Sequence, residues 1–357
     1  MNKNTHIIIN APFRLDLVMG GVSDLDWWSD KPGECLSVSC DFEGNSLRIE
    51  ASHCISPAIF LQGFTKSTGP CSFPLSIFSA NSKRLWPRDY SLVISSITVA
   101  NEIMNAAGKP RISLGGMTII NHSAWVKGMG GSSAVAACII TSVCRLFGYQ
   151  RLALNEIVRA VARAESLAEI GGGWEDSAGV FFPGINHIVY RPDESSALAV
   201  HNIPCDEITV KYLQDHLLVV DTRICALTAD ILNAAKNMFD ENPSIVMHCS
   251  DRIRAECSIM IKALAAHDAD SMGASFTRQR SNWNTITGGM SMSHEVDLRI
   301  KGIQSAVVGY REAGAGGGGT VLIMCAPQRS VDVKEHMLRH NCDVRNWIVS
   351  SYGLSNS

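Results

Sequence analysis

The pattern of apolar residues predicts two long helices in the middle of the chain. Residues 132–147 are apolar almost all round, and Gly148 follows where a left-handed residue commonly ends a helix. Residues 155–170 instead place charged side chains on one face at spacings of three and four, and Gly171 follows them. We therefore expect a fully buried helix beside an amphipathic one.

Strands are predicted on both sides of these helices. The opening stretch from Ile7 to Leu17 alternates, is β-rich and breaks at the tight turn of Gly20 and Gly21. Shorter stretches of the same kind indicate further strands at residues 36–40, 46–51, 187–190, 217–221 and 320–325. Between the last two we expect mostly helix, including residues 302–312.

Length and charge limit the possible architectures and partners. A chain of 357 residues exceeds what one hydrophobic core usually organises, so we expect two domains, 1–190 and 191–357, divided near a polar stretch that begins at Arg191. The formal charge is -3 and no dense Lys/Arg block occurs, which argues against nucleic-acid binding and favours a small-molecule partner. Whether the chain is a monomer or a homodimer is left open.

Membrane and disulfide signals are weak. The first residues contain no long apolar segment with a cleavage site, and no apolar run reaches bilayer length, so we expect a cytoplasmic protein without a membrane partner. The twelve cysteines are scattered through apolar stretches and form no CxxC pair. They are interpreted as buried thiols in a reducing compartment.

A glycine-serine segment precedes the buried helix and suits an anion. Glycines let the backbone approach a polyphosphate, amides at a helix start point toward it, and a serine hydroxyl can bind a phosphate-bound Mg²⁺. The alternative is a turn with a serine N-cap. It is not a Walker loop, because no GxxxxGK[ST] occurs. The candidate nucleotide-binding residues are Lys127, Gly128, Gly130, Gly131, Ser132 and Ser133.

A second glycine cluster, GAGGGG at residues 314–319, formally satisfies the dinucleotide fingerprint GxGxxG. That interpretation is rejected because the fingerprint should follow a strand and open a helix, whereas this segment follows the helix expected at 302–312. A flexible loop that covers substrate or phosphate, with Gly316 and Gly317 as contacts, is the better interpretation. A plain turn is the alternative.

Two carboxylates and one arginine are candidates for the chemistry. Glu165 falls on the apolar side of its helix, where a metal ion or an Arg would have to balance it. Asp176 lies between glycines and is placed to accept a hydroxyl proton, or merely to cap a turn. Arg14 is suited to stabilise phosphoryl charge or to keep Asp176 ionised, and Asp24 to bind sugar hydroxyls. Either is also compatible with a surface ion pair.

Together these segments resemble the superfamily of galactokinase, homoserine kinase, mevalonate kinase and phosphomevalonate kinase (GHMP). GGGWEDSAGVFFPGI at residues 171–185 is similar to the GGGWQDQVGG segment of L-fucose kinases and D-glycero-D-manno-heptose 7-phosphate kinases. RLDLVMGGVSD at residues 14–24 resembles their RVDFSGGWSD opening. The resemblance implies an α+β fold, with an N-terminal domain of the ribosomal-protein-S5 type and a ferredoxin-like C-terminal domain.

The resemblance also implies roles for individual residues. Asp176 corresponds to the catalytic carboxylate, Arg14 to its assisting arginine, and Ser132 and Glu165 to Mg²⁺ ligands. The implied cofactors are ATP and Mg²⁺. The substrate contacts expected from motif and resemblance are Asp24, Gly20, Gly21, Gly172, Gly173, Trp174, Gly316 and Gly317. The chain departs from the pattern at Ser177, which replaces Gln, and at Ala124, Lys127, Trp27 and Trp28.

The hypothesis from the sequence is an ATP-dependent kinase that phosphorylates a hydroxyl of a sugar or sugar phosphate, most simply the anomeric one. A sugar- and nucleotide-binding regulator without catalysis is the alternative from another class, kept open by Ser177 and Lys127. A kinase for a non-sugar alcohol is the third. Neither the sugar nor the hydroxyl follows from the sequence, because hydrogen-bond geometry decides both.

Overall fold

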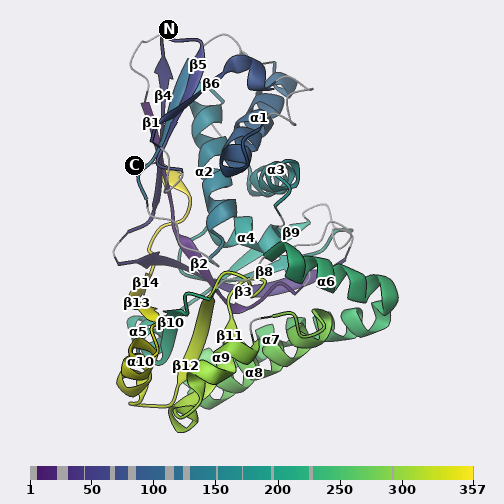
Figure 1. Cartoon of the computed structure of the whole chain (residues 1–357), viewed down its shortest axis with the longest axis vertical. Coiled ribbons are helices and arrows are strands. Elements are labelled where there is room, and N and C mark those ends of the chain that lie inside the picture. The colour runs from purple at the N-terminus through teal and green to yellow at the C-terminus, as the bar shows by residue number, and fades with distance from the viewer. Residues whose placement is uncertain are drawn as a thin grey trace.

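The computed structural model describes residues 6–21, 31–43, 45–64, 69–78, 86–108, 116–123, 129–149, 152–170, 172–193, 197–224, 228–291 and 293–356. In Figure 1 the first half of the chain forms the upper part of the molecule and most of the second half the lower part. The first sheet stands beside helices α1 to α3, and both chain ends lie on its side. A second sheet, which contains β2 and β3, lies between the two parts.

The first sheet has the strand order β15-β1-β4-β7-β5-β6 and is antiparallel except for the β5/β7 pair. Its strands are β1 (His6–Ala11), β4 (Leu47–Cys54), β5 (Ala58–Gln62), β6 (Cys71–Pro74), β7 (Gly116–Asn121) and β15 (Ser355–Asn356). Two short 3₁₀ helices, Leu75–Phe78 and Arg88–Tyr90, lead to α1 (Ser91–Ala106). Helix α2 (Gly131–Leu146) packs on β1 and β4, and α3 (Leu154–Leu167) packs on α1 and α2.

Both long helices are confirmed. The side chains of α2 are almost all buried because the sheet, α1 and α3 surround it. Helix α3 is amphipathic as expected and buries Ile157, Val161 and Ala164 toward its neighbours. It ends at Leu167, earlier than expected, because Glu169 adopts a left-handed backbone (φ 59°) and Ile170 donates its amide to the Glu165 carbonyl at 2.9 Å.

The second sheet shows that the single opening strand expected at Ile7–Leu17 was wrong. The chain instead forms β1 in the first sheet and β2 (Phe13–Val18) in the second, with Pro12 between them. Proline has no N–H for the ladder, so it favours such a break. In the second sheet β2 pairs along one edge of β3 (Gly33–Phe42). The other edge of β3 pairs with β8 (Ile185–Tyr190) and β14 (Trp347–Val349), and β9 (Leu198–Ile203) pairs with β8.

The third sheet belongs to the second half of the chain and has the order β11-β12-β10-β13. Its strands are β10 (Leu217–Asp221), β11 (Val307–Glu312), β12 (Thr320–Cys325) and β13 (Asp343–Arg345). Helices α6 to α9 separate β10 from β11, and α10 (Ser330–Arg339) separates β12 from β13. This β-α-β-β-α-β succession with antiparallel pairing is the ferredoxin-like arrangement, so the expected α+β fold is confirmed.

The helix expected at residues 302–312 was wrong. A 3₁₀ turn at Gln304–Ala306 leads directly into β11. The reason is a close backbone contact with helix α8 (Ala269–Ile286). A Cβ on Gly309 would lie 1.9 Å from the carbonyl oxygen of Gly273, so two glycines let strand and helix touch. The β-branched and aromatic residues Val307, Val308 and Tyr310 agree with a strand.

The remaining helices of the second half are α5 (Glu207–His216), α6 (Thr228–Glu241), α7 (Pro243–Ala265) and α9 (Ser293–Ile300). Helix α7 packs on α8 and also on β2 and β3 of the second sheet. The domain boundary at residues 190 and 191 stays a prediction. Pairing crosses it, because β9 and β14 join the second sheet and β15 joins the first.

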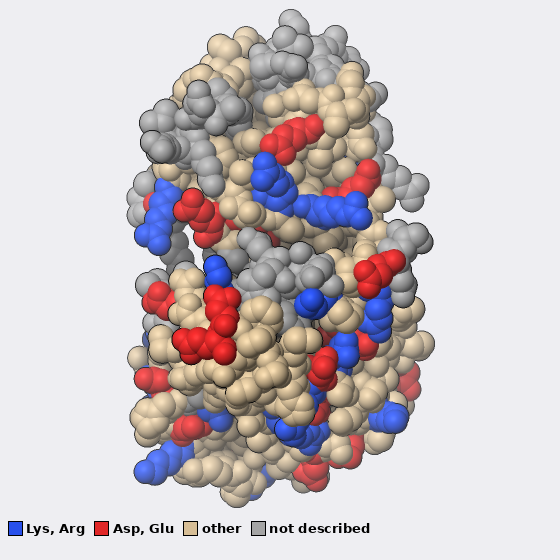
Figure 2. Space-filling model, turned by 90° about the vertical axis from the view of Figure 1, so that its right-hand side faces the viewer, with Lys and Arg blue, Asp and Glu red and all other residues tan. Residues whose placement is uncertain are grey.

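The helices, cysteines and surface charges of the described residues can be compared with what the composition predicted. No helix in the described part of the chain is long and apolar enough to cross a bilayer. Each of the eleven cysteines within the described ranges is a free thiol, and eight of these are buried. Basic and acidic side chains are interspersed over the face drawn in Figure 2, so neither sign of charge dominates it.

Candidate active site

Arg14 is the centre of a buried charge cluster on β2. Its side chain is 4% exposed and forms ion pairs with Asp16 on the same strand and with Asp176. Its backbone N–H donates to the carbonyl of Met129 at 3.3 Å, which ties β2 to the start of the glycine-serine segment. Charges this deeply buried require partners, and two carboxylates around one guanidinium leave one net negative charge.

Two glycines make room for the Arg14 side chain. A Cβ on Gly130 would lie 2.8 Å from Nε of Arg14, and a Cβ on Gly179 would lie 2.8 Å from its Cδ. Gly130 also has a left-handed backbone (φ 64°) at the N-cap of α2. Gly130 at the start of α2 and Gly179 at the end of α4 therefore admit the arginine side chain between the two helices.

Asp176 lies in the first turn of the short helix α4 (Trp174–Gly179). Its side chain is 13% exposed, more than the 4% of Arg14 and the 7% of Asp16. Arg14 binds one of its oxygens, Oδ1, through Nη2. The ion pair expected from the sequence is present, and Asp176 is its more accessible member.

Glu165 lies beneath the N-terminus of α2. It is 1% exposed and accepts a 2.8 Å hydrogen bond from Oγ of Ser133 at its Oε1. Burial raises its pKa to about 7, although Ser133 and Ser132 favour the charged form. Gly172 packs directly on this carboxylate, because a Cβ there would lie 2.0 Å from Oε2. Ser133, Glu165 and Gly172 are thus brought together.

Glu175 is a site residue that the sequence analysis missed. It is 4% exposed, and its charge contributes to raising the pKa of Glu165. Oε2 of Glu165 and Oε2 of Glu175 are both buried without a hydrogen-bond partner. Carboxylate oxygens of this kind are what Mg²⁺ binds, so the residues fit a divalent cation near the start of α2. The signal was Glu175 itself, a charge beside Asp176 in an otherwise apolar and glycine-rich segment.

The raised pKa of Glu165 predicts a pH-dependent stability effect. The ordinary pKa of a glutamate is 4.5, and that of Glu165 in the folded protein is about 7. Between these two pH values the carboxyl is ionised in the unfolded chain but still protonated in the folded one, so stability falls as the pH rises through this interval. Glu165→Gln removes that penalty. Without nucleotide or metal, we expect it to raise the free energy of unfolding at pH 8 by up to about 3 kcal/mol more than at pH 5. Urea unfolding at both pH values measures this.

The control is the exposed Glu241→Gln, which should change the free energy of unfolding equally at both pH values. An equal effect of Glu165→Gln at pH 5 and pH 8 would show that Glu165 has no raised pKa in the folded protein.

The late glycine segment forms the β11–β12 hairpin loop. Ala313 donates its N–H to Thr320 at 2.9 Å, and Nε1 of Trp283 on α8 donates to the carbonyl of Ala315 at 3.2 Å. The dinucleotide interpretation stays rejected, now because the loop connects two strands and opens no helix. Gly316 and Gly317 are buried here, and their contact with substrate stays a prediction.

Two further residues that the sequence analysis missed join the second half of the chain to β2. Gln279 on α8 accepts from the N–H of Met19 at 3.1 Å and donates to the carbonyl of Leu17 at 3.0 Å. Arg311, next to the glycine loop, is fully buried and donates to the carbonyl of Asp16. Burial lowers its pKa to about 9. A polar residue that pairs across the chain leaves no local pattern, so sequence alone did not reveal either.

The other sequence-predicted residues lie as follows. Gly21 has a left-handed backbone (φ 75°), and a Cβ there would lie 2.9 Å from Oγ of Ser250 on α7. Trp174 is buried and stacks on Tyr190 with ring centroids 5.5 Å apart, while Gly33 makes room for its ring. Gly20 precedes Gly21, and Gly173 is the N-cap of α4. Asp24, Lys127, Gly128, Ala124, Trp27 and Trp28 lie outside the described residues.

Part of the sequence matches a known protein family. Residues 94–184 match the family described as GHMP kinases N terminal domain. A bifunctional fucokinase/GDP-fucose pyrophosphorylase of Arabidopsis thaliana is 23% identical over 96% of this chain. The chain spans about a third of that protein's length, 32%.

Two solved structures show the same fold. A D-glycero-D-manno-heptose 1-phosphate kinase from Bacteroides thetaiotaomicron has a TM-score of 0.71 at 16% identity, with 98% of each chain covered. A Lactococcus lactis galactokinase in complex with galactose has a TM-score of 0.69 at 14% identity, covering 99% of this chain and 95% of that one.

Proposed function

The chain carries a GHMP kinase N-terminal domain within a GHMP kinase fold, and on this premise we propose that it transfers the γ-phosphate of ATP to a hydroxyl of a sugar or sugar phosphate. The observation that carries the proposal is the ion pair between Arg14 and the more accessible Asp176, beside the N-terminus of α2. A base, a buried cation and helix-start amides are what phosphoryl transfer requires in one place.

Asp176 and Arg14 are proposed to act directly in the reaction. Asp176 accepts the hydroxyl proton, with Oδ1 held by Arg14 and Oδ2 turned to the acceptor. The freed oxygen bonds to the γ-phosphorus as the bond to the β–γ bridging oxygen breaks, and ADP leaves. Arg14 offsets the negative charge that develops between acceptor and phosphate.

The phosphates are proposed to lie at the start of α2. The N–H groups of its first turn, at Gly131, Ser132 and Ser133, have no carbonyl partner within the helix by geometry, so they are available to bind an anion. Glu165 and Ser132 would hold Mg²⁺, with Glu175 beside them. When bound, Mg²⁺ would neutralise phosphate charge. Lys127 and Gly128 are proposed to contact the nucleotide as well.

The acceptor is proposed to be a monosaccharide or its phosphate, and the anomeric hydroxyl is the proposed position. This follows the similarity to the fucokinase and to the galactokinase and heptose phosphate kinase folds. Ser177 lies where fucose kinases carry Gln, and its hydroxyl donates to the Trp174 carbonyl at 3.3 Å inside its own helix. It therefore offers no equivalent polar contact, and an acceptor other than L-fucose is expected.

The test is ADP release from MgATP with L-fucose, D-arabinose, galactose, mannose and heptose phosphates, and with homoserine and mevalonate as non-sugar acceptors. Titration calorimetry measures the binding of each sugar. We expect one sugar class to stimulate ADP release severalfold over the sugar-free rate. Sugar and nucleotide binding without ADP release would reject the kinase and support the regulator. Stimulation by homoserine or mevalonate alone would reject a sugar acceptor.

A further inference from the structure

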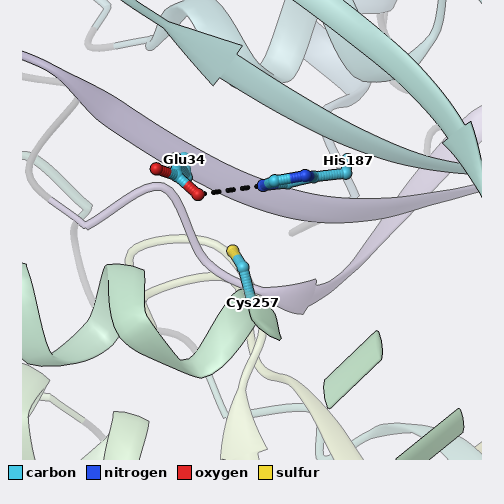
Figure 3. Close-up of side chains that lie close together, drawn as sticks. All are labelled: Glu34, His187 and Cys257. Carbon is cyan, nitrogen blue, oxygen red and sulfur yellow. Dashed lines mark hydrogen bonds and ion pairs between the residues drawn. The ribbon is translucent and has the colours of Figure 1, made fainter. Parts of the chain in front are cut away.

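A cluster of three different metal-ligating side chains lies away from the Arg14 cluster. Glu34 is near the start of β3, His187 is on β8, and Cys257 is in the middle of α7. Because Leu36 pairs with His187 in the antiparallel register, Glu34 and His187 are diagonal neighbours on one face of the sheet. Helix α7 covers that face and directs the Cys257 thiol toward both side chains (Figure 3).

The three ligand atoms are close to a metal-binding arrangement. Oε2 of Glu34 lies 3.0 Å from Nε2 of His187, and all three ligand atoms lie within 4.8 Å of one another. Tetrahedral Zn²⁺ with bonds of about 2.0 to 2.3 Å would hold its ligand atoms about 3.3 to 3.8 Å apart. A movement of the Cys257 sulfur by about 1 Å therefore brings the three ligand atoms to the separations that Zn²⁺ requires.

The donor set selects the metal class. One thiolate sulfur, one imidazole nitrogen and one carboxylate oxygen suit Zn²⁺ and related borderline-soft cations. Mg²⁺ and Ca²⁺ bind oxygen ligands instead, so the cluster differs in kind from the site at Glu165.

Neighbouring groups support the ligands. Arg191 donates to Oε1 of Glu34 at 2.9 Å, which orients the carboxylate and leaves Oε2 for the metal. His201 is the cross-strand partner of His187, with ring centroids 6.1 Å apart, but it lies outside the three-residue cluster, so the fourth position is left to water. Glu34 and Arg191 also line a surface cavity of about 370 Å³, which provides an entry path.

We propose that Glu34, His187 and Cys257 form a binding site for Zn²⁺ or a cation of that class, which clamps α7 to β3 and β8. Binding displaces the thiol proton of Cys257 to solvent. The hydrogen on Nε2 of His187 moves to Nδ1 or to solvent, so that coordinate bonds from Nε2 and from Oε2 of Glu34 replace their hydrogen bond. The site joins helix α7 to two strands that both lie before residue 191. It does not depend on the proposed kinase activity.

The test measures Zn²⁺ binding to the nucleotide-free protein by titration calorimetry in excess Mg²⁺, with Co²⁺ as a spectroscopic probe. We expect one Zn²⁺ per chain, a rise in Tm with Zn²⁺, and a thiolate-to-cobalt absorption band with Co²⁺. Cys257→Ser should abolish the band and raise the Kd by more than about 100-fold, because even outer partners of a metal ligand typically change affinity 10- to 100-fold.

The matched control is Cys249→Ser, a buried cysteine on the same helix outside the cluster. It should bind Zn²⁺ and show the cobalt band like the wild type. If Cys257→Ser does not yield folded protein, Glu34→Gln is used instead, because Glu34 is partly exposed. It should cause the same loss of Zn²⁺ affinity. Equal Zn²⁺ affinity in Cys257→Ser and Cys249→Ser would overturn the proposal.

A competing site is the histidine pair on and just after α10. The rings of His336 and His340 are tilted by 30° with centroids 4.2 Å apart; His336 is buried and His340 exposed, so His340 is the member that a metal ion in solution would reach. His340→Ala should leave Zn²⁺ affinity and the cobalt band unchanged. Loss of Zn²⁺ binding in His340→Ala, with Cys257→Ser unaffected, would place the metal there and overturn the proposal.

Discussion

Asp176→Asn is expected to lower kcat by about 10² to 10⁴-fold while the Kd for MgATP changes little. The amide keeps the size of the carboxylate but cannot accept the hydroxyl proton. The nucleotide is proposed to bind at the start of α2 and at Glu165, so its affinity should persist. Steady-state ADP release with the accepted sugar measures kcat, and calorimetry with a non-hydrolysable ATP analogue measures nucleotide binding.

The matched control is Asp16→Asn, because both substitutions leave Arg14 with one carboxylate partner instead of two. If the loss came only from the altered charge around Arg14, the two variants would lose similar activity. We expect Asp16→Asn to retain at least about tenfold more activity than Asp176→Asn. Near-wild-type turnover in Asp176→Asn would remove the residue from the role of base.

Arg14→Met should lower the free energy of unfolding by about 3 to 5 kcal/mol and abolish turnover. The arginine is 4% exposed between two carboxylates, and methionine leaves both without their cation. Methionine approximates the aliphatic part of the side chain that packs against Gly130 and Gly179, so the loss reports mainly on charge. Urea unfolding at pH 7 measures the free energy, and ADP release the turnover.

The comparison variant is Arg223→Met, which breaks a bidentate ion pair with Asp343. The side chains of Arg223 and Asp343 are 52% and 51% exposed, so water can solvate the carboxylate that remains and the expected loss is much smaller. Equal losses in the two variants would contradict a special role for burial at Arg14. Retained turnover in Arg14→Met would contradict its proposed part in catalysis.

Hydrophobic periodicity predicted the elements that bury one continuous face or all of their surface. Helices α2 and α3 and strands β10 and β12 were predicted this way, because burial itself creates the apolar pattern. The order of the glycine-rich segments predicted the fold only through the resemblance to GHMP kinases that it carries, whereas the glycines themselves mark where backbone meets backbone or ligand. Arg14, Glu165 and Asp176 were chosen because a charge inside an apolar or glycine-rich segment requires a partner.

The predictions that failed concerned elements and residues whose positions depend on contacts between distant segments of the chain. The strand at β11 exists because Gly309 meets Gly273 of α8, and residues 302–312 alone do not encode that meeting. Pro12 separates two strands that enter different sheets, whereas alternation alone predicted one. Gln279 and Arg311 reach β2 from more than 250 positions away, so no spacing rule connects them.

The sequence by itself determined which residues carry charge and where the backbone is free to turn, because both are properties of single residues and their neighbours. Only the tertiary structure decided which charges meet. It placed Asp16 and Asp176 on Arg14, set Glu175 near Glu165, and brought Cys257 to Glu34 and His187. The reason is physical: partners of a buried charge are selected by three-dimensional proximity and desolvation, and neither quantity is local in the chain.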